Sequence, residues 1–209
     1  MKIAIIGSGI SGLTCAYMLN RKHDITIFEK NDYIGGHTHT HEIEHNGIKW
    51  NVDSGFIVYN ERTYPNFINI LDRLGVERQL TRMGFSVKSE KNDLEYAGHS
   101  LNGLFAQRSN LVRPSFIRML RSMWRFNSEA RADLKELNSD ITLGEYLKLN
   151  DYPEEFIQHF IIPIGAAIWS TVPHQMMNMP AIFFIRFFDN HGLLQIVDRP
   201  NWWVITGGS

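Results

Sequence analysis

The sequence predicts an α/β fold: one parallel βαβ unit at the N-terminus, an added β-hairpin region and a mainly helical second part. Two observations support this prediction. A glycine-rich turn at residues 7–12 separates a short apolar run from a helical pattern. From about residue 100 onward, strand-like alternation gives way to long stretches of helical periodicity, several of which begin at proline.

The composition is that of a folded protein. Hydrophobic residues make up 44% of the 209 residues and charged residues 21%, which provides enough apolar surface to offset chain entropy. The formal net charge of -1 argues against a general nucleic-acid-binding protein. A single cysteine, Cys15, excludes an internal disulfide, and no apolar stretch is long enough to span a bilayer, so we expect a cytoplasmic protein.

The first thirty residues predict one βαβ unit. Lys2 to Ile6 is a short apolar run typical of a buried strand. Residues 10–21 carry apolar side chains at helical spacing, and Ile25 to Glu29 predicts a second strand. Such a unit has parallel strands and a right-handed crossover.

The glycine-rich turn has the spacing of a dinucleotide-binding loop. Gly7, Gly9 and Gly12 give G-x-G-x-x-G between the predicted strand and helix. The first glycine allows a tight turn, the second lets the backbone approach a pyrophosphate, and the third lets helix and strand pack closely. Glu29, twenty positions after Gly9, is placed to accept hydrogen bonds from an adenosine ribose. The unit is therefore Rossmann-like.

Shorter elements are expected next. Thr40–Glu44 and Ile48–Asp53 are strand-like, and Asn46-Gly47 between them is typical of a tight hairpin turn. A helix is expected from Pro65 to Gly75, since proline suits a first helical turn and glycine a C-terminal cap. Two short strands are expected within residues 84–97.

Prolines and a capping pattern mark the later helices. Pro114 opens a long helix that is expected to reach about Leu137. Thr142 and Glu145 match a capping box, in which hydroxyl and carboxylate each satisfy a free backbone donor. Pro153 starts another helix, which Pro163 is expected to end or kink.

A second glycine pair favours FAD over NAD. Gly35-Gly36 follows Glu29 after five residues and lets another backbone stretch come close to the same phosphates. The segment E-x5-G-G-H-T-H-T resembles the flavin amine oxidase, protoporphyrinogen oxidase and phytoene desaturase superfamily. There, an E-x5-G-G-R-x-x-T segment runs along the FAD pyrophosphate and ribose. His37 occupies the arginine position, which weakens the charge contact, and Thr40 fits the last position.

The resemblance extends further along the chain. Asn51–Phe56 is similar to the D-x-G turn that brings backbone near the flavin ring, and Leu71–Val76 to the family's L-x-x-L-G helix ending. The whole chain resembles the N-terminal half of a bacterial group of predicted FAD-binding oxidoreductases. Together with the glycine loop, this resemblance implies a set of cofactor-binding residues: Gly7, Gly9, Ile10, Ser11, Gly12, Glu29, Lys30, Gly35, Gly36, His37, Thr40, Gly55 and Phe56.

The expected domain organisation follows from these motifs. Residues 1–60 form the N-terminal part of the FAD-binding domain, residues 61–200 a mainly helical, substrate-domain-like region, and residues 201–209 the start of a return into the FAD domain. A doubly wound fold needs several parallel strands, and one βαβ unit is clear here. We therefore expect an incomplete domain whose first strand, central in a full sheet, leaves an edge exposed.

The resemblance implies a FAD-dependent oxidoreductase. It would oxidise or desaturate a C–N or C–C bond by hydride transfer to flavin N5, on a small, apolar or lipid-like substrate. The flavin supplies the difficult chemistry, and the sequence names no catalytic acid or base. Two alternatives stay open: an NAD(P)-dependent oxidoreductase, which Gly35-Gly36 disfavours, and an inactive FAD-binding or interaction module. The oligomeric state is not determined.

His37, His39 and His41 alternate, so they would share one face of an extended strand. Three imidazoles on one face could bind a transition metal, but no acid or cysteine completes the site. We therefore expect no metal site and interpret this stretch as a polar strand beside the cofactor.

Two further patterns each have two interpretations. Residues 98–128 contain no acid, and Arg118, Arg121 and Arg125 recur there at helical spacing. That pattern is typical of a solvated helix face, and also of a peripheral contact with an anionic surface such as the inner membrane face.

The methionines and phenylalanines within 176–188 are typical of a core, or alternatively of an apolar substrate pocket.

Overall fold

The computed structural model describes residues 1–137, 140–195 and 198–209. The chain divides into two compact units. Unit 1 comprises Met1–Arg82 and Asn201–Ser209, and unit 2 comprises Met83–Pro200. The two ends of the chain thus belong to one unit. The division into FAD-binding and substrate regions at residues 60 and 200 is a functional one, and it stays a prediction.

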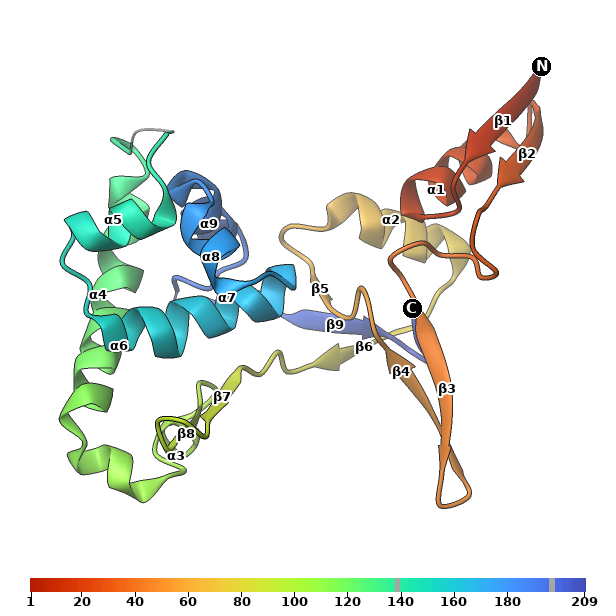
Figure 1. The fold of residues 1–209 in the computed structure, drawn as a ribbon. Coiled ribbons are helices and arrows are strands. Elements are labelled where there is room, and N and C mark those ends of the chain that lie inside the picture. The colour runs from red at the N-terminus through yellow and green to blue at the C-terminus, as the bar shows by residue number, and fades with distance from the viewer. Residues whose placement is uncertain (138–139, 196–197) are drawn as a thin grey trace. The chain divides into compact units, whose positions relative to one another are not determined.

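Unit 1 begins with the predicted βαβ unit (Figure 1). Strand β1 (Lys2–Ile6) pairs in parallel with β2 (Asp24–Phe28), and helix α1 (Ile10–Leu19) connects them. Within the described residues, β1 has a strand neighbour on one side only. The apolar side chain of Ile6 is 82% exposed, so this small sheet has an uncovered surface as well as a free edge.

The predicted hairpin follows. Strand β3 (Thr40–His45) pairs with β4 (Ile48–Asp53) in antiparallel fashion, and Figure 1 shows a two-stranded ribbon. Asn46 and Gly47 make the turn with φ values of 53° and 74°. Both lie in the left-handed region, which asparagine and glycine adopt most readily, so this residue pair fixes the turn and the register.

A three-stranded antiparallel sheet that we do not predict from the sequence completes unit 1. Its order is β5 (Tyr59–Asn60), β9 (Trp202–Ile205) and β6 (Arg78–Thr81), and helix α2 (Pro65–Leu74) lies between β5 and β6 in the chain. The Glu61 carboxylate accepts hydrogen bonds from the Asn201 backbone N–H (2.8 Å) and from Nε1 of Trp203 (3.0 Å). The C-terminal segment is thereby attached to unit 1.

Unit 2 combines the second predicted hairpin with helices. The hairpin consists of β7 (Ser86–Ser89) and β8 (Leu94–Ala97). The helical segments are α3 (Leu101–Leu104), the 3-10 helix η1 (Arg108–Val112), α4 (Pro114–Asp133), α5 (Leu143–Leu149), α6 (Glu154–Phe156), the π-helix η2 (Ile157–Ile161), α7 (Ile162–Trp169), α8 (Pro173–Asn178) and α9 (Ala181–Asn190).

The core of unit 2 is aromatic. Phe126 of α4 contacts the rings of Tyr146, Phe156 and Phe188, all of which are buried. Met176 is buried with them, so the core interpretation of the 176–188 pattern is confirmed for these side chains. Phe183 is an exception, with 49% of its surface exposed.

Two helices end earlier than expected. The first ends at Leu19, two residues before residue 21, and the long helix ends at Asp133, one turn before Leu137. Of the two outcomes expected at Pro163, an end or a kink, the helix does not end there: a π-helical turn precedes the proline and α7 continues to Trp169. Proline has no N–H, so the carbonyl four residues earlier loses its helical donor. That carbonyl belongs to His159, and it accepts a hydrogen bond from the Tyr96 hydroxyl (2.7 Å) instead. The capping box of Thr142 and Glu145 is formed as predicted.

Candidate functional site

The glycine loop of residues 7–12 connects β1 to α1. Gly7 has φ = 92°, a conformation that favours glycine. A Cβ built on Gly12 would lie 2.1 Å from the carbonyl oxygen of Gly7, so no side chain fits at that position. The first and third glycines are therefore required by the backbone itself, whether or not a ligand is bound.

The N-terminus of α1 is uncapped. Its N-cap residue, Gly9, makes no side-chain capping bond, and the first turn contains no acidic residue. The N–H groups of Ile10, Ser11 and Gly12 come too early in the helix for an intrahelical acceptor. A Cβ built on Gly9 would meet only the Gly36 Cα, at 4.0 Å. The loop thus has free donors, a positive helix end and no side chain over them, which is an arrangement that suits phosphate.

The second glycine pair lies against this loop. Gly35 forms a parallel bridge with Gly9, and the Gly35 N–H donates to the Ser8 carbonyl (3.1 Å). Gly36 has φ = 65°. The structure therefore brings together two backbone stretches that the sequence places more than twenty residues apart.

Glu29 holds the glycine loop from the end of β2. Its Oε2 accepts hydrogen bonds from the Ser8 N–H (2.8 Å) and hydroxyl (2.5 Å), and its Oε1 from the N–H groups of Lys30 (2.7 Å) and Asn31 (2.9 Å). These bonds, led by the one from Asn31, lower the pKa of Glu29 to about 2. The carboxylate is ionised at neutral pH, and it orders the loop in addition to any contact with a ribose.

The remaining predicted residues gather at the base of the hairpin. A Cβ on Gly55 would stand 1.7 Å from the carbonyl oxygen of His37, so these two backbone segments touch. The Thr40 hydroxyl lies 2.6 Å from Oδ1 of Asp53. Phe56 offers its backbone carbonyl to the Ser209 hydroxyl (3.0 Å).

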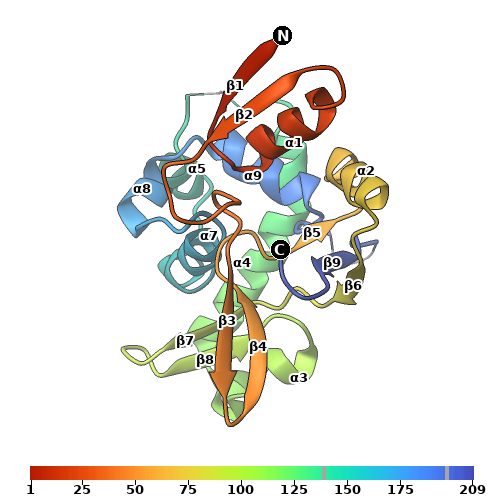
Figure 2. The ribbon, with the colours of Figure 1, turned by 90° about the vertical axis from the view of Figure 1, so that its right-hand side faces the viewer.

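The C-terminal residues join this cluster, and Figure 2 shows the C-terminus beside the hairpin. Oδ1 of Asp53 accepts hydrogen bonds from both the N–H (3.0 Å) and the hydroxyl (3.1 Å) of Ser209. Partial burial raises the pKa of Asp53, but the hydrogen bonds from Thr40 and Ser209 outweigh it and hold the pKa below its usual value. Asp53 belongs to the predicted D-x-G turn and Ser209 to the predicted return segment, but neither is among the predicted cofactor-binding residues. The glycine pair at 207–208 is the signal that could have pointed to them.

Two of the three alternating histidines, His39 and His41, have their rings in contact. His39 stacks on Tyr33 at 4.2 Å and contacts the His41 ring at 4.0 Å between centroids. Nε2 of His41 is hydrogen-bonded to the Ser54 hydroxyl (2.8 Å). In the described part of the chain, no group of three or more His, Cys, Asp or Glu side chains could hold a metal ion.

Helix α4 contains four arginines, of which Arg131 forms an ion pair with Asp189 (3.1 Å). Two of the other three, which form the predicted arginine pattern, also bind other parts of unit 2. Arg118 forms an ion pair with Glu155. Arg125 donates to the Asn150 carbonyl (2.5 Å) and lies 4.0 Å above the Tyr152 ring. These two side chains therefore have structural roles, whereas Arg121 is exposed and has no partner among the described residues. Among the described residues, no helix is long and apolar enough to cross a membrane.

These features together define a dinucleotide-binding protein of the α/β class: a parallel βαβ unit, an uncapped glycine loop and a second glycine pair against it. Residues 10–197 match the family described as flavin containing amine oxidoreductase, and the chain belongs to that family. Membership confirms the predicted superfamily and indicates a flavin cofactor. The open loop at Gly9 fits FAD, since its free N–H groups face no protein side chain.

Three proteins illustrate the similarity. The chain is 39% identical over 74 residues to 1-hydroxycarotenoid 3,4-desaturase of Flavobacterium sp. (strain P99-3), covering 35% of this chain and 14% of that protein. It is 23% identical over 187 residues to protoporphyrinogen oxidase 2 of Arabidopsis thaliana, covering 84% and 34%. The solved structure of cyclohexylamine oxidase from Brevibacterium oxydans IH-35A has the same fold, with a TM-score of 0.63 at 19% identity. That match covers 99% of this chain and 46% of the oxidase, so the chain spans about half of that fold.

Proposed function

We propose that this chain carries the FAD pyrophosphate-binding part of a flavin-dependent oxidoreductase. The observation that supports this most directly is the uncapped start of α1 at Gly9, with Gly35 bridged to it and no side chain between them. When bound, FAD supplies the hydride acceptor, so the protein has to bind, orient and shield the substrate.

Six of the predicted residues have a specific role in this proposal. The N–H groups of Ile10, Ser11 and Gly12 hold the pyrophosphate at the positive end of α1. Glu29 keeps the loop in shape through Ser8 and offers its oxygens to the adenosine ribose. At the base of the hairpin, the backbone of Gly55 and Phe56 would approach the flavin.

The choice of substrate is a property of the whole protein and not of this chain alone. The 1-hydroxycarotenoid 3,4-desaturase is named for a long apolar molecule, which supports a lipid-like substrate and a desaturation of a C–C bond. The amine oxidase family supports oxidation of a C–N bond equally. We propose a small, apolar or lipid-like substrate, without choosing between the two bonds.

The cofactor experiment separates the alternatives. The purified chain is incubated with FAD, NAD or NADP, and binding is measured by calorimetry and by the flavin absorption spectrum. We expect FAD to bind with at least tenfold preference. Tighter binding of NAD or NADP would overturn the proposal. Flavin that binds but is never reduced by any amine or apolar alkene would favour the inactive FAD-binding module.

Contact with an anionic membrane surface is a separate part of the proposal, and it concerns unit 2. The acid-free stretch 98–128 includes three very exposed apolar side chains, Leu101 at 77%, Val112 at 84% and Trp124 at 66%. Arg121, exposed on α4 one turn from Trp124, adds an uncompensated positive charge. Apolar and basic side chains together are what a peripheral helix presents to such a surface.

A further inference from the structure

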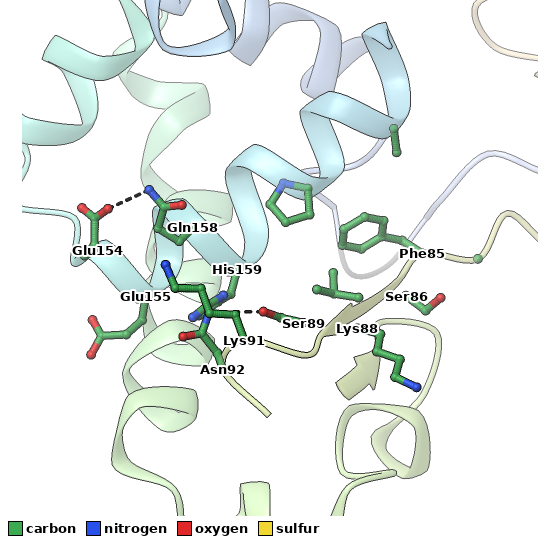
Figure 3. Close-up of a pocket in the computed structure, with 14 residues that line it drawn as sticks. Phe85, Ser86, Lys88, Ser89, Lys91, Asn92, Glu154, Glu155, Gln158 and His159 are labelled. Atoms are coloured by element: carbon green, nitrogen blue, oxygen red, sulfur yellow. Dashed lines mark hydrogen bonds between the residues drawn. The ribbon is translucent and has the colours of Figure 1, made fainter. Parts of the chain in front are cut away.

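Unit 2 contains an open groove of about 1020 Å³ (Figure 3). One wall is β7 with the turn that follows it. The opposite wall is the continuous helical stretch of α6, η2 and α7. The π-helical turn lies in the middle of this wall, and such turns are frequent at functional sites. A volume of this size is at the upper end of the range of small-molecule sites.

The groove is polar at one end and apolar at the other. Phe85, Val87, Pro163 and Ala167 line the more apolar end, where Ser86 also lies beside Phe85. The polar end is lined by side chains from the β7–β8 turn and from α6 and η2: Ser89, Lys91, Asn92, Glu154, Glu155, Gln158 and His159. A ligand that fills the groove therefore needs an apolar body and a polar head.

The charges at the polar end favour an anionic head. Arg118 forms an ion pair with Glu155, whereas Glu154 has no cationic partner among the described residues and accepts a hydrogen bond at Oε1 from Gln158 (2.7 Å). Lys88, Lys91 and Arg118 together outnumber these two carboxylates by one positive charge. Lys91 makes no ion pair or hydrogen bond with any described residue. Figure 3 shows its side chain extending toward the side of Gln158. Its ammonium group is thus a cation without a protein partner at the edge of the groove.

The groups near Lys91 are compatible with an anionic head. His159 lies in the π-helical turn, where burial and then the nearby positive charge of Arg113 lower its pKa. It is therefore neutral at pH 7 and a hydrogen-bond partner for the head. Lys88 also lines the groove, but Figure 3 shows its side chain extending away from His159 and Gln158.

We propose that this groove binds a single-chain carboxylate amphiphile, such as a fatty acid. Its carboxylate pairs with Lys91, and its chain lies along Pro163 and Ala167 toward Phe85. The proposal deepens the proposed function by naming a substrate class, and its link to catalysis rests on that function. Binding itself involves unit 2 alone and needs no flavin.

The test uses a naturally fluorescent fatty acid, cis-parinaric acid, titrated into the chain below its micellar concentration. We expect saturable binding that Lys91→Gln weakens about fivefold to tenfold. Lys88→Gln is the matched control and should leave the affinity unchanged. Ala167→Trp should block the apolar end and abolish binding, while circular dichroism verifies that the variant is folded.

Comparison of head groups completes the test. The fatty alcohol of the same length should bind more weakly than the acid, and equally to wild type and Lys91→Gln. Equal affinities for acid and alcohol, or a fatty amine that binds more tightly, would overturn the proposal. So would equal losses in Lys91→Gln and Lys88→Gln, or binding that occurs only on vesicles. Flavin content, measured on the same samples, reports on the proposed function independently. A flavin-loaded chain that does not bind the acid refutes this inference alone.

Discussion

Gly36 lies so close to Gly9 that a Cβ built on Gly36 would stand 2.8 Å from the Gly9 Cα. A Cβ on Gly9, by contrast, would approach no protein atom more closely than 4.0 Å. The two positions thus respond differently to a side chain. A side chain at Gly9 would enter open space, whereas a side chain at Gly36 would clash with the backbone of the glycine loop. This asymmetry allows cofactor binding and folding to be tested separately.

We expect Gly9→Val to abolish FAD binding and leave a folded chain, because the new side chain meets the phosphate site and little else. Flavin content and the thermal unfolding midpoint are measured together. Gly84→Ala is a matched control, since its Cβ also enters open space but in unit 2. Gly12→Val should instead unfold the βαβ unit, given the 2.1 Å approach to Gly7. Normal flavin content in Gly9→Val would refute the phosphate-loop assignment.

Glu29→Ala should weaken FAD binding by about tenfold to a hundredfold, because charge-assisted hydrogen bonds to the loop and the ribose are lost. The dissociation constant is measured by flavin fluorescence. Glu44→Ala, an exposed carboxylate on the hairpin, is the control and should bind FAD normally.

The pH dependence has a defined sign. The pKa of the Glu29 carboxyl is about 2 in the folded chain, against 4.5 for a carboxyl without these hydrogen bonds. The stabilisation of the loop by the ionised carboxylate is therefore complete above pH 4.5 and is lost as the pH falls toward 2. FAD affinity should therefore show no Glu29-dependent change between pH 5 and 8. A Glu29-dependent transition within that range would contradict the hydrogen-bonding pattern.

Thr142→Ala should destabilise unit 2 by about 0.5 to 2 kcal/mol, because its hydroxyl caps α5 by accepting a hydrogen bond from the Glu145 N–H. Urea denaturation, monitored by far-ultraviolet circular dichroism, gives the free energy of unfolding. Thr142→Ser preserves the hydroxyl and should stay close to wild type. A loss of equal size in both variants would point to the methyl group and not to the cap.

Trp124→Ala should reduce co-sedimentation with anionic vesicles several-fold if the 98–128 surface contacts membranes, because an exposed aromatic ring is lost. Arg121→Gln should reduce it as well, by the roughly 1 kcal/mol that a basic residue near such a surface contributes. Leu149→Ala removes an equally exposed apolar side chain outside the stretch and should have no effect. Equal binding to neutral and anionic vesicles would reject the contact.

The uncovered sheet of unit 1 predicts self-association. Ile6 and Phe28, at the ends of β1 and β2, are 82% and 54% exposed, and α1 has no fully buried side chain. A free parallel edge next to exposed apolar surface invites pairing between chains. We expect the apparent molecular mass of the isolated chain, measured by light scattering, to rise with concentration. Met18→Lys, on the exposed surface of α1, should reduce this rise. A concentration-independent monomer would contradict this.

Local signals account for what the sequence predicts correctly. The βαβ unit, the Asn46-Gly47 hairpin, the start of α4 at Pro114 and the capping box of Thr142 each depend on residues within a few positions of one another. In those cases the preferred backbone conformation is set by the residues themselves, through proline φ, glycine freedom or a side chain that reaches the adjacent backbone. The first glycine loop is likewise predicted from its spacing, and the second glycine pair from its spacing together with the family resemblance.

The features that only the tertiary structure decides all join distant residues. β9 enters the sheet between β5 and β6, Ser209 reaches Asp53, and the Tyr96 hydroxyl replaces the donor that Pro163 removes from His159. No residue near Asp53 indicates a partner 156 positions away, because the path of the chain, set by burial of the whole core, determines which surfaces meet. The groove beside Lys91 is of the same kind: its two walls are about 70 residues apart, and only their packing creates a space between them.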